Sequence, residues 1–316
     1  MNDIVVSLPY IESRAEYCHG ISEAGEQSAF VHARTRPTVV ALGVGRKAIA
    51  KRYGDRTRAL QDMAADLPDR PSPGDIHDLR VAARRIQMMR RIMPRSVRDS
   101  QGPKRFDLAL RMTLKATSKL RDMDTLTDTL KSYGDSLPSG LLVNLENQRS
   151  DASARAKVAI GALCEIPAPE LDASGLSGKR LSKKLRKGLR KHSMVASSLL
   201  KEALIDESKA AELHSLRKEV KRMRYLAELA NEPPGRLLPL TKWQESLGAI
   251  HDIDVAIAYL KGVSADSGKT ILELQRARHS KYLAFIREAR TVRALGKEGA
   301  LAAGGLGPAD LNPAKG

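Results

Sequence analysis

The sequence has few aromatic residues and few cysteines, and each scarcity argues against a class of protein. Aromatic residues make up 3% of the 316 residues, with one Trp and three Phe. Proteins that hold single-stranded nucleic acid usually stack its bases on several aromatic rings, so this class is disfavoured, whereas duplex binding through phosphates is not. The two cysteines, Cys18 and Cys164, have neither metal-ligand spacing nor a disulfide framework, which fits a reduced, cytoplasmic setting.

Long apolar stretches are absent as well. No window of the sequence approaches the apolar length of a membrane span. Residues 1–6 lack the basic region and the apolar run of a signal peptide. We therefore expect a cytoplasmic protein without a membrane partner.

Positive charge, in contrast, is abundant. Lys and Arg number 54 against 37 Asp and Glu, which gives a formal net charge of +17. An excess of this size favours an anionic partner: nucleic acid, a membrane surface or a soluble polyanion.

Apolar residues recur with helical spacing through most of the chain, and this periodicity predicts an all-α fold. Residues 1–37 show no sustained periodicity and 296–316 are rich in Gly, Ala and Pro, so we expect a flexible N-terminal segment and a disordered tail. Between them, Pro and Gly clusters separate eight predicted helices. These lie at 38–66, 74–93, 103–133 and 139–165 in an N-terminal half (38–166), and at 179–204, 207–231, 236–262 and 266–295 in a C-terminal half (179–295), after a linker (167–178).

Two segments of the N-terminal half return in the C-terminal half, in the same order. His77-Asp78-Leu79-Arg80 returns as His214-Ser215-Leu216-Arg217, at an offset of 214 − 77 = 137 residues. Leu120-Arg121-Asp122-Met123-Asp124 returns as Ile250-His251-Asp252-Ile253-Asp254, at an offset of 252 − 122 = 130 residues. The repeat predicts two similar four-helix bundles.

The second helix of each half carries a basic stripe opposite an apolar face. At a helical step of roughly 100° per residue, the basic residues fall within about 60° of the histidine. Like charges at these spacings repel one another, so a stripe that occurs twice favours an anion bound over it. Arginine and lysine donors suit phosphate oxygens. The stripes consist of His77, Arg80, Arg84 and Arg91 in the first half, and His214, Arg217, Lys221 and Arg224 in the second.

The first helix of each half adds further positive charge. Arg46 and Lys47 fall on Lys183 and Lys184 at the same offset of 137 residues, and Lys187 follows one turn later. A basic amphipathic helix also suits a membrane surface, but the apolar seam here is narrow and lacks Trp and Phe.

The repeated His-x-x-Arg-x-x-x-(Arg/Lys)-Arg helices and the Arg-Asp-x-Asp segment of the third helix resemble the CHAD family, the conserved histidine α-helical domain. The resemblance covers about residues 38–295. It implies two four-helix bundles related by a pseudo-twofold axis, a basic cleft that binds inorganic polyphosphate, and association with polyphosphate granules. By motif position it implies binding by His77, Arg80, Arg84 and Arg85, and by His214, Arg217, Lys221 and Arg222. Lys221 stands where many relatives have Arg, and His251, at the position of Arg121, is assigned no direct role.

Two rival functions use the same residues. A metal-dependent phosphohydrolase could use His77-Asp78 and His251-Asp252 with Asp122, Asp124 and Asp254, but Ser215 replaces Asp78 in the repeat while the basic stripe is kept. Non-specific binding to the phosphate backbone of nucleic acid remains open, because phosphate contacts dominate the affinity of such binding too.

We predict a polyphosphate-binding protein that is not an enzyme and needs no metal or cofactor. The sequence leaves its oligomeric state open. Its predicted contacts are Arg46, Lys47, His77, Arg80, Arg84, Arg85, Arg91, Lys183, Lys184, Lys187, His214, Arg217, Lys221, Arg222 and Arg224.

Overall fold

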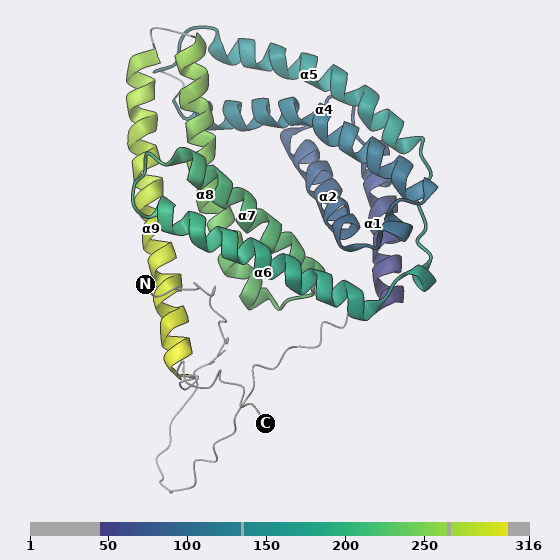
Figure 1. Ribbon diagram of the computed structural model, residues 1–316. Helices are drawn as coiled ribbons and strands as arrows, with labels where there is room; N and C mark the ends of the chain where they lie inside the picture. Colours follow the sequence, from purple (N-terminus) through teal and green to yellow (C-terminus); the bar gives the residue numbers. More distant parts are fainter. Residues whose placement is uncertain (1–44, 134–135, 264–266, 303–316) are drawn as a thin grey trace, which may run out of the picture.

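The computed structural model describes residues 45–133, 136–263 and 267–302, and these residues are mostly helical (Figure 1). No β-strand occurs among them, so the predicted all-α class is confirmed. The elements of the described chain, in order, are α1 (Arg46–Ala65), α2 (Pro73–Ile92), α3 (Arg95–Arg98), α4 (Gln101–Lys131), α5 (Leu141–Cys164), the 3-10 helix η2 (Ala173–Gly175), α6 (Gly178–Ala203), α7 (Ala210–Leu229), α8 (Pro234–Val263) and α9 (Gly268–Ala302).

The eight predicted helices correspond in order to the eight long helices of the described chain. The first prediction, 38–66, is met from Arg46 onward, because residues 38–44 and the predicted flexible segment 1–37 lie outside the described residues. Helix α9 continues to Ala302, beyond the predicted helix end at residue 295, and residues 303–316, which make up most of the predicted tail, lie outside the described part. The short elements α3 and η2 were missed because a single turn has too few residues to show periodicity.

Helix α2 begins at a defined capping motif. The Ser72 hydroxyl accepts a hydrogen bond from the Asp75 backbone N–H at 3.2 Å, and the Asp75 carboxylate accepts one from the Ser72 N–H at 2.8 Å. Pro73 occupies the first helical position, where no N–H donor is needed. The motif fixes where α2 starts.

The core of the N-terminal half extends into the C-terminal half. Buried side chains of α1, α2 and α4, such as Tyr53, Ile86 and Phe106, form one continuous cluster with Leu181 of α6 and Leu226 of α7. Burying a leucine side chain contributes about 1.5–3 kcal/mol to folding. The linker between the halves therefore does not separate two independent cores.

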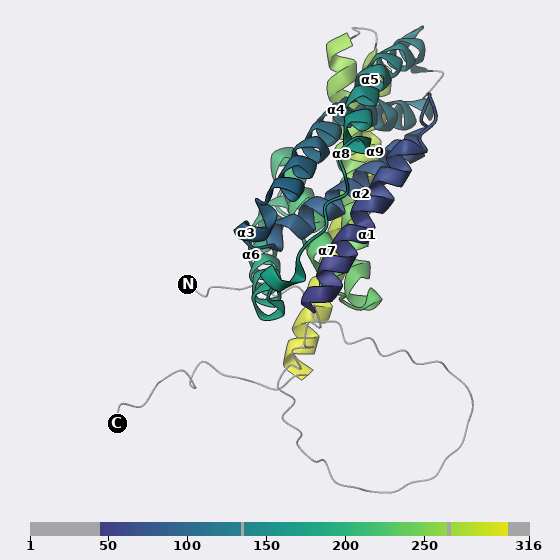
Figure 2. The ribbon, with the colours of Figure 1, turned by 90° about the vertical axis from the view of Figure 1, so that its right-hand side faces the viewer.

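The C-terminal half has a cluster of its own, formed by α6 to α9. Trp243 and Phe285 meet edge to face within it, with ring centroids 6.0 Å apart. A third cluster joins the ends of α4 and α5 to those of α8 and α9. Figures 1 and 2 show one body in which α2 lies beside α7 where the halves meet. The pseudo-twofold relation between the halves stays a prediction.

An ion pair joins the third and fourth helices of each half. In the first half the Asp124 carboxylate, whose side chain is fully buried, accepts a hydrogen bond from Arg149 Nε at 2.6 Å. In the second half Asp254 accepts one from Arg278 Nε at 2.5 Å. Two aspartates that the sequence offered as metal ligands therefore hold α4 to α5 and α8 to α9.

Candidate anion-binding site

Arg80 is the fixed member of the basic stripe on α2. Its Nη1 donates to the Leu114 carbonyl oxygen and to the Thr117 hydroxyl of α4, each at 2.7 Å. Leu79 and Ile86 are fully buried on the opposite side of the helix, as the helical phase predicts. The guanidinium is thus held in one orientation, and its other N–H donors make no hydrogen bond within the described chain.

Lys221, which corresponds to Arg84 in the repeat, belongs to the basic stripe of α7 and is half-buried. Burial, followed by the charges of Arg217, Arg84, Arg80 and Arg224, lowers its pKa from 10.5 to about 8. The ammonium group makes no hydrogen bond or ion pair with any residue in the described ranges. Keeping it charged at pH 7 therefore costs the ligand-free protein on the order of 3 kcal/mol.

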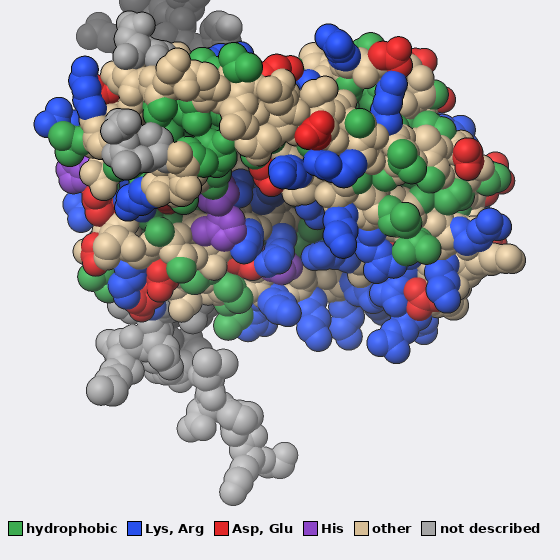
Figure 3. All heavy atoms as spheres, turned by 90° about the horizontal axis from the view of Figure 1, so that it is seen from above, with side chains coloured by type: hydrophobic (Ala, Val, Ile, Leu, Met, Phe, Trp, Pro, Cys, Tyr) green, Lys and Arg blue, Asp and Glu red, His purple; other side chains and the backbone are tan. Residues whose placement is uncertain are grey.

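The neighbours of Lys221 show that the two stripes converge. Arg80 and Arg84 belong to α2, whereas Arg217 and Lys221 belong to α7, which packs against it. Figure 3 shows Lys, Arg and His side chains gathered around a hollow on this side of the molecule. One hydrogen-bond donor of these stripes is unsatisfied: Arg217 Nε is buried and has no hydrogen-bond partner in the part of the chain described.

His77 lies at the edge of the same group of cations. Burial lowers its pKa, with a further lowering by the charges of Arg121 and Lys221 on other helices. The imidazole is therefore neutral near pH 7 in the ligand-free protein and becomes easier to protonate when an anion is near. We refer to His77, Arg80, Arg84, Arg121, Arg217 and Lys221 as the central cluster.

Arg121 is a member that sequence reasoning did not select. It interacts electrostatically with His77 and Arg80 of its own half and with Asp252 of the other. The sequence does contain a pattern that could have identified it, because Arg121 is the first residue of the repeated Arg-Asp-x-Asp segment.

Two carboxylates border the central cluster. Burial raises the pKa of Asp122, against the opposing charges of Arg80 and Arg121. Burial likewise raises the pKa of Asp252, which interacts with Arg217, Arg121 and Asp122. Each half therefore places one aspartate beside the stripe arginine of its second helix.

His214 and His251 form a direct pair at the second stripe. Their Nδ1 atoms are 3.0 Å apart and their ring centroids 4.4 Å apart. At this separation one ring donates an N–H to the other, which must be unprotonated there, so at most one ring carries a positive charge. Burial, then Arg217 and His214, lowers the pKa of His251 to about 4. His251, to which the sequence assigned no direct role, therefore contacts a stripe residue.

Three predicted contacts are already paired with carboxylates. Arg85 Nε of α2 donates to Glu228 of α7 at 3.0 Å, and Arg224 pairs with the same carboxylate. Arg224 also donates to Gln244 at 2.8 Å. Arg222 pairs with Glu219 of its own helix. These residues carry less uncompensated charge than the central cluster.

The basic residues predicted on the first helix of each half lie on the surface. Arg46 and Lys47 begin α1, and both are exposed. On α6, Lys183 and Lys187 are exposed, while Lys184 donates to the Met93 carbonyl oxygen at 2.8 Å. None of these five is among the charges that shift the pKa values of His77, Arg80, Arg217 and Lys221 in the described chain.

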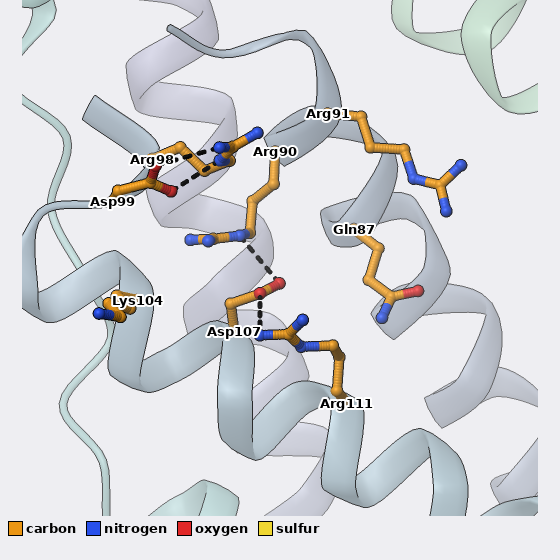
Figure 4. Close-up of a pocket in the computed structure, with 8 residues that line it drawn as sticks. All are labelled: Gln87, Arg90, Arg91, Arg98, Asp99, Lys104, Asp107 and Arg111. Atoms are coloured by element: carbon orange, nitrogen blue, oxygen red, sulfur yellow. Dashed lines mark hydrogen bonds and ion pairs between the residues drawn. The ribbon is translucent and has the colours of Figure 1, made fainter. Parts of the chain in front are cut away.

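Arg91, the last residue of the first stripe, lines a separate cavity between α2, α3 and α4 (Figure 4).

In the described ranges, no three His, Cys, Asp or Glu side chains are grouped so as to hold a metal ion. No helix there combines the length and the apolar character that crossing a membrane requires.

The chain was compared with known proteins. No curated protein matches it. Among solved structures, the crystal structure of the CHAD domain from the plant Ricinus communis is similar, with 20% identity, a TM-score of 0.47, and coverage of 80% of this chain and 90% of that one. The family model of the CHAD domain matches residues 51–261, which is more than half of the sequence. The protein is therefore a member of the CHAD domain family.

Proposed function

We propose that the protein binds inorganic polyphosphate at the central cluster and does so without catalysing a reaction. The observation that carries the proposal is Lys221, a half-buried ammonium that faces arginines of two helices and has no anionic partner in the described chain. A bound anion removes this unfavourable charge, so part of the free energy stored at the cluster becomes binding free energy.

The arrangement suits phosphate in particular. Arg80, Arg84 and Arg217 supply planar sets of N–H donors that match phosphate oxygens, and one of these donors, Arg217 Nε, is buried and unsatisfied. A group of cations at short spacing is best matched by an anion that carries a charge on each successive unit.

The arrangement also favours a thin anion over a duplex. Cations converge on the cluster from α2 and α7, and several of them are half-buried. A linear phosphate chain can be surrounded from two sides, whereas a nucleic acid duplex presents its phosphates on the outside of a wide cylinder to one protein face. We therefore place nucleic acid second.

The test is to reverse the charge at Arg84 and Lys221 together, as R84E/K221E. Each lost charge-assisted contact is worth about 1.5–3 kcal/mol, so polyphosphate affinity is expected to fall about 100-fold or more in a calorimetric titration. The matched control is R155E/R276E, since both arginines are exposed, on α5 and α9, and neither has a partner among the described residues. Circular dichroism should show unchanged helix content in both variants, and equal affinity of the two variants would contradict the proposal.

A further inference from the structure

We infer that the cavity between α2, α3 and α4 is a second phosphate subsite, which extends the central cluster and is filled only by long polyphosphate chains. This inference rests on the proposed function. The cavity has a volume of about 370 Å³ and is lined by polar and charged side chains (Figure 4). That volume lies in the range of small-molecule sites.

The floor of the cavity is a fixed ion-pair network. Arg90, which is 5% exposed, donates through Nε to Asp107 at 2.9 Å and also bonds the Pro103 carbonyl oxygen. Arg111 reaches the other oxygen of Asp107 at 3.1 Å. One carboxylate therefore serves two guanidinium groups and can neutralise only one of them.

Two unpaired cations lie at the rim of the cavity. Arg91 and Lys104 are exposed and line the cavity from α2 and α4. Neither makes an ion pair or hydrogen bond with a residue of the described chain. Arg98 is paired with Asp99 at 2.8 Å. The cavity thus has five cationic side chains against two carboxylates, a net charge of 5 − 2 = +3, which suits a phosphate group.

A hydrogen bond on α2 links the central cluster to this cavity. Arg84, which interacts with Lys221, donates to the Gln87 side-chain oxygen at 3.2 Å. Gln87 lines the cavity and lies one turn before Arg91. At a rise of 1.5 Å per residue, the helix axis advances roughly 16 Å from Arg80 to Arg91. A chain of many phosphates can occupy both places, and a triphosphate cannot.

The experiment compares tripolyphosphate with long-chain polyphosphate on the full-length protein. In the double variant R91E/K104E, affinity for the long chain should fall about tenfold, whereas affinity for tripolyphosphate should stay within about twofold of wild type. The control R155E/R276E changes the net charge by the same amount on α5 and α9, and should leave both affinities nearly unchanged.

Two outcomes overturn the subsite. Either the long chain binds R91E/K104E as tightly as it binds the control, or both ligands are weakened equally, which indicates a general charge effect. Failure of the proposed function looks different: R84E/K221E would then bind both ligands as well as wild type does. If wild type binds neither ligand, both proposals fail.

Discussion

The carboxylate of Glu228 in α7 accepts a hydrogen bond from Arg85 Nε in α2 at 3.0 Å. The same carboxylate pairs with Arg224 one turn earlier on α7, and its charge also reaches Arg56 of α1. The Glu228 side chain is only 17% exposed. It therefore joins the two halves beside the central cluster and offsets part of the positive charge there.

We predict that Glu228→Gln lowers stability and strengthens binding. Removing the carboxylate leaves Arg85 and Arg224 without a counter-ion, so the free energy of unfolding should fall by about 1–3 kcal/mol in urea. Polyphosphate should bind several-fold more tightly, because local positive charge increases. Glu146→Gln, at an exposed site on α5, is the control. Weaker binding by Glu228→Gln would contradict the placement of the anion beside α2 and α7.

We predict that Lys221→Met raises stability and weakens binding. In the folded protein the lysine pKa is about 8, and in the unfolded chain it returns to 10.5, so the unfavourable charge is fully present below pH 8 and fades as the pH rises toward 10.5. At pH 7 the methionine variant should be more stable by about 3 kcal/mol, yet bind polyphosphate at least tenfold more weakly. Chemical denaturation and titration on the same preparation check both.

The pH dependence of binding isolates the same ammonium. Wild-type affinity should decline as the pH rises above about 8, because the ligand-free protein then loses the Lys221 proton. Lys221→Arg keeps its charge and should hold its affinity up to about pH 10. Parallel pH profiles for the two proteins would show that Lys221 does not contact the anion.

The histidine pair predicts a loss of stability in acid. Folded His251 resists protonation down to about pH 4, whereas the unfolded chain takes up this proton near pH 6.5. The free energy of unfolding should therefore decrease as the pH falls from 6.5 to 4, by about 3 kcal/mol from this group. His251→Gln should lack this contribution when the two unfolding curves are subtracted. Asp122 and Asp252, with raised pKa values, act in the opposite direction in both proteins.

The ion pair of Asp124 and Arg149 is predicted to be structural. Asp124→Asn leaves the arginine without a counter-ion near a fully buried site, which should cost about 3–5 kcal/mol in unfolding free energy. Polyphosphate affinity of the folded fraction should not fall, because the change removes a negative charge that acts on Arg121 of the central cluster and removes no contact with the anion. Thermal denaturation followed by titration below the transition separates the two effects, and a loss of affinity without loss of stability would assign Asp124 to the site.

The helices and the directions of their faces could be predicted from the sequence, because both depend on local geometry. The positions of His77, Arg80 and Arg84 on one face follow from 3.6 residues per turn, and the capping motif at Ser72 fixes where the helix starts. The repeat then placed an equivalent stripe on α7.

Which basic side chains lack a negatively charged partner could not be predicted from local sequence. Whether an arginine is free depends on partners distant in sequence: Arg85 meets Glu228, 143 residues away, and Lys184 meets the Met93 carbonyl, 91 residues away. Arg85 and Lys221 look alike in the sequence motif, yet one is paired and the other is not. The cavity at Arg91 likewise depends on how α3 and α4 pack on α2.

The most direct test of polyphosphate binding at the central cluster is a competition between polyphosphate and duplex DNA of matched total charge. Each displaces a labelled polyphosphate chain from the protein, at about 0.05 M and about 0.2 M salt, where counterion release lowers both affinities. We predict that polyphosphate displaces the label at a lower phosphate concentration than DNA does at both salt concentrations, and that R84E/K221E removes this preference. Equal displacement by the two polyanions would contradict a polyphosphate site and leave a general cationic surface.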